Sequence, residues 1–248
     1  MLAALCACSV NYSRAYENAL ELFGNGEYAE AAQAFERLGD YARAEGYAAY
    51  SRGLILWQQG DFVAAEPYFA ASRDLLYGEQ RYQYCHACVL AAGGDYLAAA
   101  AVLAQIEDFE DAAAHRQYYL GKAAQQSGDY EAALYAYEAA GDYLDAADIL
   151  LALQVDIYTH ARALMIAGDY QNAATLFMML GSYHNSAELS VECQQVYREA
   201  LYAQAEALLA ANDLQGAYDT FVSLESFSDS AARAAELAAL LGINTNAE

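Results

Sequence analysis

The feature that most constrains this chain is a turn motif that recurs at nearly constant spacing. A glycine, an acidic residue and an aromatic residue follow one another at five regularly spaced anchors, and a sixth, degenerate copy stands at Asn212-Asp213-Leu214. The glycines of the five clear copies are Gly26, Gly60, Gly94, Gly128 and Gly168. Successive anchors are 34, 34, 34, 40 and 44 residues apart. A period of this length is typical of proteins built from stacked structural repeats.

Four more columns keep a constant offset from the anchor in all six copies. Ten residues before it is a tyrosine: Tyr16, Tyr50, Tyr84, Tyr118, Tyr158 and Tyr202. Seven before it is a small residue: Ala19, Gly53, Ala87, Gly121, Ala161 and Ala205. Five after it is always alanine: Ala31, Ala65, Ala99, Ala133, Ala173 and Ala217. Nine after it is a large apolar or aromatic residue: Phe35, Phe69, Leu103, Tyr137, Phe177 and Phe221.

These columns predict a pair of antiparallel helices in every copy. Glycine suits a left-handed helix end, and the acidic residue after it can accept hydrogen bonds from the first free amides of the next helix. Small residues on both sides of the turn let the two helices approach closely, and the large residue fills the space that they leave. A second turn about 13 residues later, as in Leu38-Gly39-Asp40-Tyr41, leads into the next pair.

The units resemble tetratricopeptide repeats, which combine a 34-residue period with small, glycine, tyrosine, alanine and aromatic positions at these offsets. The resemblance runs from about Tyr16 to Phe221, but the tryptophan and the proline of the family pattern are missing. The Leu-Gly-Asp-Tyr turns are similar to a variant found in Gram-positive bacterial proteins, some of them lipoproteins. The resemblance implies an all-α, right-handed α-solenoid of about six helix-turn-helix repeats.

We expect one solenoid over residues 11–241, closed by a C-terminal capping helix at Ser228–Leu241, with a frayed tail at 242–248. The longer last two spacings add about 6 and 10 residues to the first helix of their repeats. They predict a change of curvature between residues 150 and 200 rather than a domain boundary. Pro67 lies within a second helix and should kink it, because proline cannot donate the backbone hydrogen bond.

The charge of the chain excludes one large class of partner. It has 34 Asp and Glu against 11 Lys and Arg, for a formal net charge of −23. Nucleic-acid binding depends on cations that displace counterions from phosphates, so this chain would be repelled by a polyanion. Anionic membrane surfaces are excluded for the same reason. The 58% hydrophobic content argues against disorder despite the charge.

The five cysteines, Cys6, Cys8, Cys85, Cys88 and Cys193, are too few and too scattered for a disulfide framework. Leu5-Cys6-Ala7-Cys8-Ser9 resembles the lipobox of bacterial lipoproteins, with Cys8 as the lipidated residue. Residues 1–10 are then a truncated lipoprotein signal; alternatively they begin the first helix. No other uninterrupted apolar stretch has the 18 to 20 residues that span a bilayer. Cys85 and Cys88 lie within a predicted helix and lack a second ligand pair, so we expect no metal or redox site.

The resemblance also implies a concave groove lined by the first helix of each pair, which receives a peptide or a partner helix. Its positions here include a tyrosine column, one tryptophan and three cations: Tyr50, Trp57, Arg81, Tyr84, Tyr118, Lys122, Tyr158 and Arg162. Two interpretations of the tyrosines are open, because they can serve as groove surface or pack adjacent first helices together. Lys122 and Arg162 can hold a partner's carboxylate or be solvated cations paired locally.

Phosphate loops, metalloprotease motifs and nucleophile elbows are absent from the sequence. The acidic cluster Glu107, Asp108, Glu110 and Asp111 lacks the spacing of a calcium loop and reads as a solvated turn with an N-cap. We therefore expect a non-enzymatic scaffold without cofactors that binds a protein or peptide, as a membrane-anchored surface lipoprotein. The alternatives are a cytoplasmic adaptor or assembly factor and a glycan-binding protein or enzyme.

Overall fold

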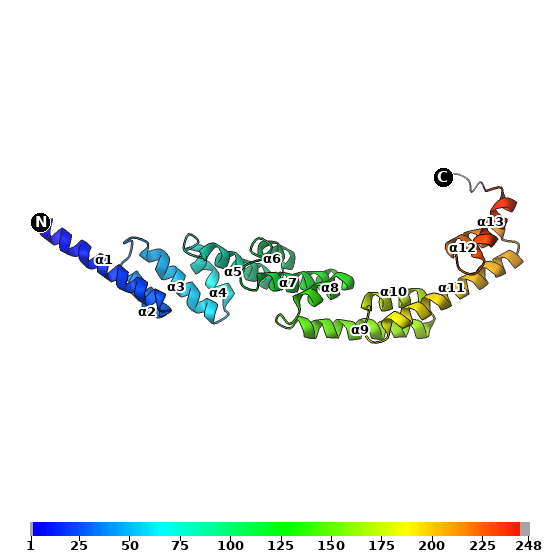
Figure 1. Cartoon of the computed structure of the whole chain (residues 1–248), viewed down its shortest axis with the longest axis horizontal. Coiled ribbons are helices and arrows are strands. Elements are labelled where there is room, and N and C mark those ends of the chain that lie inside the picture. The colour runs from blue at the N-terminus through cyan, green and yellow to red at the C-terminus, as the bar shows by residue number, and fades with distance from the viewer. Residues whose placement is uncertain (1, 244–248) are drawn as a thin grey trace. The chain divides into compact units, whose positions relative to one another are not determined.

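The computed structural model describes the backbone of residues 2–243 and the side chains from residue 11 onward. Within this range every regular element is a helix (Figure 1), which confirms the predicted all-α fold of helix pairs. The helices are α1 (Leu2–Gly24), α2 (Tyr28–Glu36), α3 (Ala44–Gln58), α4 (Phe62–Ala70), α5 (Gly78–Ala92), α6 (Tyr96–Leu103), α7 (Ala112–Ser127), α8 (Tyr130–Ala140), α9 (Ala146–Ala167), α10 (Tyr170–Leu180), α11 (Ser186–Ala210), α12 (Leu214–Ser223) and α13 (Ser230–Leu241).

The chain divides into two compact units, Met1–Leu150 and Leu151–Glu248. In the first unit each helix from α1 to α8 packs against the next one along the chain. In the second unit α10 to α13 pack in the same successive way. Contacts between consecutive helices are the mark of an α-solenoid, in which a repeat touches only its neighbours.

The turn has the predicted capping in five of the six pairs, whereas Glu27 in the first pair makes no side-chain capping hydrogen bond. All five anchor glycines are left-handed, with φ between +75° and +85°, and Asn212 takes the same conformation in the sixth copy with φ +61°. The aspartate after the anchor caps the second helix by accepting a hydrogen bond from the amide three residues on. These bonds measure 3.0 Å from Asp61, 3.1 Å from Asp95, 3.0 Å from Asp129, 3.3 Å from Asp169 and 2.9 Å from Asp213.

The small residues lie where the two helices of a pair meet. The alanine column and the large-residue column are fully buried in every copy. A Cβ atom on Gly53 would lie 2.9 Å from the Phe69 ring, and one on Gly121 would lie 2.7 Å from the Tyr137 ring. Glycine at these two positions therefore allows a closer approach of ring to helix than alanine would. This confirms the predicted packing of each αα-hairpin.

The tyrosine column connects successive repeats. In four of the six copies the tyrosine hydroxyl donates to a residue 27 positions later, which immediately precedes the first helix of the next repeat or the capping helix. The bonds join Tyr84 to Asp111 at 2.6 Å, Tyr118 to Asp145 at 2.6 Å, Tyr158 to Asn185 at 2.7 Å and Tyr202 to Asp229 at 2.5 Å. Asp111 makes no capping hydrogen bond to its own helix, so its predicted role as an N-cap is replaced by this contact.

The first helices of the last two repeats are longer than those of the second to fourth repeats, as predicted. Helices α9 and α11 have 22 and 25 residues, against 15 in α3 and α5 and 16 in α7. The predicted change of curvature stays a prediction. Pro67 is inside α4 without ending it. The predicted capping helix is α13, which ends at a left-handed Gly242; the predicted frayed tail falls mostly outside the described residues.

Helix α9 has the length and hydropathy of a membrane span, which the search for uninterrupted apolar stretches missed because Asp148 and Asp156 interrupt it. Only 17% of its most apolar window is buried. Its repeat positions nevertheless take part in a protein core, because Ala161 packs in one cluster with Phe177 of α10 and Cys193 of α11. Cys8 lies among residues 1–10, whose side chains are outside the described part, so its lipidation stays a prediction.

Candidate functional site

The tyrosines predicted to line the groove are engaged within the chain. Tyr50, Tyr84 and Tyr118 are 1%, 2% and 9% exposed. The hydroxyl of Tyr50 accepts a 2.7 Å hydrogen bond from Arg81, while those of Tyr84 and Tyr118 donate to the aspartates described above. Burial is the main reason that the pKa of Tyr84 and of Tyr118 is raised. This geometry favours the packing interpretation for Tyr50, Tyr84 and Tyr118.

Arg81 is a cation among aromatic rings. Its guanidinium carbon lies 5.4 Å from the ring centre of Trp57, 5.8 Å from those of Tyr50 and Phe109, and 5.9 Å from that of Tyr77. Its Nε is buried without a hydrogen-bond partner. The described residues provide no carboxylate partner for it, whereas Arg43, Arg52, Arg73, Arg116 and Arg233 each pair with one. Aromatic rings stabilise such a cation without neutralising it.

Trp57 joins this site to the next repeat. Its ring packs 4.9 Å from Phe62 and 5.0 Å from Tyr84, and Phe62 in turn lies 5.1 Å from Tyr84. These contacts bring the predicted groove residues Tyr50, Trp57, Arg81 and Tyr84 together in one aromatic surface. All of them belong to the first unit.

A pocket of about 540 Å³ continues this surface between α4, α5 and α7. Phe62, Tyr96, Tyr118, Tyr119 and Tyr143 supply aromatic walls, and Lys122 is its cation. The Nζ atom of Lys122 lies 5.0 Å from the centre of the Tyr118 ring. Like Arg81, Lys122 forms no ion pair with any carboxylate of the described residues. We call this space the Lys122 pocket.

His115 forms part of the wall of the Lys122 pocket and is 4% exposed. Its ring centre lies 4.2 Å from that of Tyr119, 5.0 Å from that of Tyr143 and 5.2 Å from that of Tyr84. Burial lowers its pKa to about 4, so the imidazole is neutral at pH 7. The Nδ1 atom is buried and has no hydrogen-bond partner among the described residues. The charge of the pocket at neutral pH therefore comes from Lys122 and the carboxylates at its rim.

The other two predicted groove residues, Tyr158 and Arg162, belong to the second unit. Tyr158 donates to Asn185, and the side chain of Arg162 is exposed. Exposed apolar side chains accompany Arg162 on α9, namely Leu151, Val155 and Ile166.

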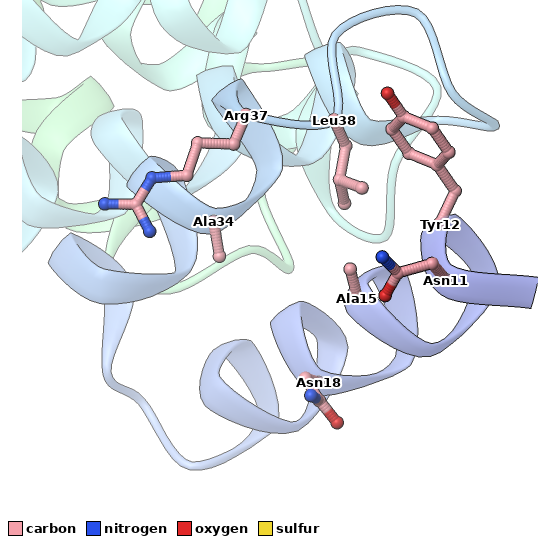
Figure 2. A pocket seen from close by; sticks show the side chains of 7 residues that line it. All are labelled: Asn11, Tyr12, Ala15, Asn18, Ala34, Arg37 and Leu38. Atoms are coloured by element: carbon pink, nitrogen blue, oxygen red, sulfur yellow. The ribbon is translucent and has the colours of Figure 1, made fainter. Parts of the chain in front are cut away.

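A second pocket of about 530 Å³ lies between α1 and α2 (Figure 2). Asn11, Tyr12 and Asn18 line it from α1, and Arg37 and Leu38 from the end of α2. Figure 2 shows the guanidinium of Arg37 extended away from Tyr12 and Asn11, so the polar groups do not converge on one point. The Lys122 pocket, with its rings and its cation gathered together, is the stronger candidate.

The cysteine pair in α5 is unsuited to thiolate chemistry. Cys85 and Cys88 are buried free thiols, and burial raises the pKa of both, that of Cys88 to about 11. They are therefore protonated at neutral pH, whereas metal binding and nucleophilic attack need the thiolate. Among the described residues no three or more His, Cys, Asp or Glu side chains converge in the manner of a metal site.

Four aromatic residues of the Lys122 pocket were not among the predicted groove residues: Phe62, Tyr96, Tyr119 and Tyr143. Three of them follow an acidic residue in a turn motif, Phe62 and Tyr96 after the anchors Gly60 and Gly94 and Tyr143 in the second kind of turn. Phe109, which faces Arg81, occupies the equivalent place in Glu107-Asp108-Phe109. The periodic turn aromatics were therefore a usable signal for the groove.

No protein-family profile matches the chain, and no curated protein is significantly similar to it. The fold and the site define its class: an all-α solenoid of helix pairs whose first unit has an aromatic cluster around Arg81 and a pocket with Lys122, two cations that lack ion-pair partners among the described residues.

Proposed function

We propose that the chain is a non-enzymatic scaffold that binds a protein or peptide through the aromatic groove of its first unit. One observation supports this above all others. In a chain with 34 acidic residues, Arg81 and Lys122 lie against aromatic rings rather than on carboxylates. Aromatic surface with a few fixed cations is well suited to protein recognition, because rigid rings bury large area at small entropic cost.

Two further features fit binding better than catalysis. The tyrosine hydroxyls that could activate a substrate are already bonded to aspartates or arginine. His115, the one histidine of the groove, is neutral and walled by rings. The tetratricopeptide resemblance points to the same conclusion, since such solenoids commonly present their first helices to a peptide.

The proposal is tested by selecting random twelve-residue peptides from a display library on the full-length protein. Enriched peptides are then titrated against the wild type, Lys122→Ala and Arg116→Ala. Arg116 is the matched control, because it lies on the same helix but is ion-paired with Glu107 at 2.8 Å. Loss of one charged hydrogen bond, about 1.5–3 kcal/mol, predicts a roughly tenfold or greater rise in Kd for Lys122→Ala only. Absence of any enriched peptide would refute the proposal.

A further inference from the structure

The Lys122 pocket has features that restrict what a bound peptide can be. This inference rests on the proposed function and specifies the ligand of the same site. Its volume of about 540 Å³ is in the range of pockets that hold a ligand group rather than a single water. Six of its fourteen lining residues carry aromatic rings, and small or aliphatic residues supply most of the others. A bulky apolar side chain is the group that such walls bury most favourably.

Asp61, which lines the pocket, and Asp145, which is bonded to the lining residue Tyr118, are already engaged by the chain. Asp61 accepts the amide of Ala64 at 3.0 Å, and Asp145 accepts the hydroxyl of Tyr118 at 2.6 Å. The Tyr118 hydroxyl, with the charge of Lys122 as a smaller contribution, lowers the pKa of Asp145. Lys122 is thus close enough for its charge to affect the pKa of Asp145, but it makes no ion pair with that carboxylate. Its ammonium keeps donors for an incoming acceptor.

The cation also decides which charge a ligand can carry. An aromatic pocket alone would attract a cationic ligand through the ring faces. Here Lys122 already lies over the ring of Tyr118 and would repel a second cation. His115 adds no charge of its own near pH 7 because its pKa is lowered to about 4. A carboxylate beside the apolar group is therefore the complement of this pocket.

We infer that the Lys122 pocket binds a peptide segment in which a bulky apolar residue fills the aromatic cavity and a neighbouring Asp or Glu pairs with Lys122. The rest of the segment is neutral or basic. The net charge of −23 repels further acidic residues, although salt screens that repulsion beyond about 8–10 Å.

The test repeats the peptide selection on three variants of the full-length protein. Lys122→Glu reverses the charge, and Ala92→Trp places a ring in the pocket, which the exposed Ala92 lines. Ala113→Trp is the control for the second variant, because Ala113 is exposed on α7 and does not line the pocket. Circular dichroism establishes that all variants remain helical.

Wild-type protein should enrich peptides with Asp or Glu next to Leu, Ile, Met, Phe or Trp. Lys122→Glu should enrich peptides with Lys or Arg in place of Asp or Glu, while the preference for an apolar neighbour remains. Ala92→Trp should raise the Kd of the selected peptides at least tenfold, and Ala113→Trp should leave their Kd unchanged. Enriched peptides without an acidic preference, or with one that Lys122→Glu leaves intact, would overturn this inference while the proposed function stands. Failure to enrich any peptide would overturn both.

Discussion

The hydrogen bond from Tyr118 to Asp145 makes a quantitative prediction about how the repeats are held together. Tyr118 lies on α7, and Asp145 directly precedes α9, so the bond joins one repeat to the start of the next. The substitution Tyr118→Phe removes the hydroxyl and keeps the ring, which packs 6.0 Å from Tyr137. The perturbation therefore tests the hydrogen bond rather than the packing.

The expected loss of stability follows from the environments of the two partners, the buried Tyr118 and the exposed Asp145. A hydrogen bond to a charged acceptor contributes about 1.5–3 kcal/mol to stability. Asp145 is exposed, so water replaces part of that bond when the hydroxyl is lost, and we expect about 1–1.5 kcal/mol. Asp145→Ala should cost about 1–3 kcal/mol, because it leaves the hydroxyl of the buried Tyr118 without its partner. The coupling between the two substitutions should be about 1 kcal/mol.

Urea denaturation of the wild type, both single variants and the double variant measures this coupling at pH 7. Tyr135→Phe is the control, since Tyr135 is 73% exposed, and it should change stability by less than about 0.5 kcal/mol. The Tyr118 hydroxyl lowers the pKa of Asp145, so its contribution is present above the ordinary pKa of an aspartate and is lost as the pH falls through the folded value. Coupling below about 0.3 kcal/mol at pH 7 would refute the connecting role.

Three other substitutions test separate parts of the account, each by urea denaturation. The pKa of His115 is lowered from 6.5 to about 4, so the unfolded state binds more protons than the folded state between these pH values. Lowering the pH from 7 to 5 should therefore reduce the free energy of unfolding of the wild type by about 2 kcal/mol more than that of His115→Gln. An equal reduction in both proteins would contradict the burial of His115 as a neutral group. Leu76 has φ +41° and is 67% exposed, so Leu76→Asn should stabilise by about 0.5–1 kcal/mol; destabilisation would argue against backbone strain there. Gly53→Val should cost about 1–3 kcal/mol because its Cβ meets the Phe69 ring, whereas Gly24→Val, with open space around it, should cost less.

The helix pairs could be predicted because their determinants are local and periodic. Gly128, Asp129 and Ala133 lie within six residues of one another, and each has one physical role that recurs in most copies. Turn, cap and close helix contact therefore follow from residue type and spacing. The left-handed residues at the repeat junctions were missed, because Ala42, Leu76, Glu110, Leu144 and Ser228 are not of the types that favour this conformation.

The site could be predicted only in part. Arg81 and Lys122 stood out because cations are rare in this chain, and both lie in the groove of the first unit. The pairing of Tyr84 with Asp111 was not foreseen, because it depends on how one repeat is rotated against the next. The same holds for the rings that surround His115, which come from α5, α7 and the turn before α9. Contacts between repeats are set by three-dimensional geometry, which residue spacing alone does not specify.

Lys122 is the only lysine of the chain, which permits a direct test of the groove as the binding site. Reductive methylation with ¹³C-formaldehyde labels its amine and the N-terminal amine while keeping their positive charge. In a titration with a selected peptide, we predict that the NMR signal of Lys122 shifts to saturation with the Kd found for binding, while the N-terminal signal stays in place. A peptide that binds without moving the Lys122 signal would contradict the central claim that this groove receives the partner.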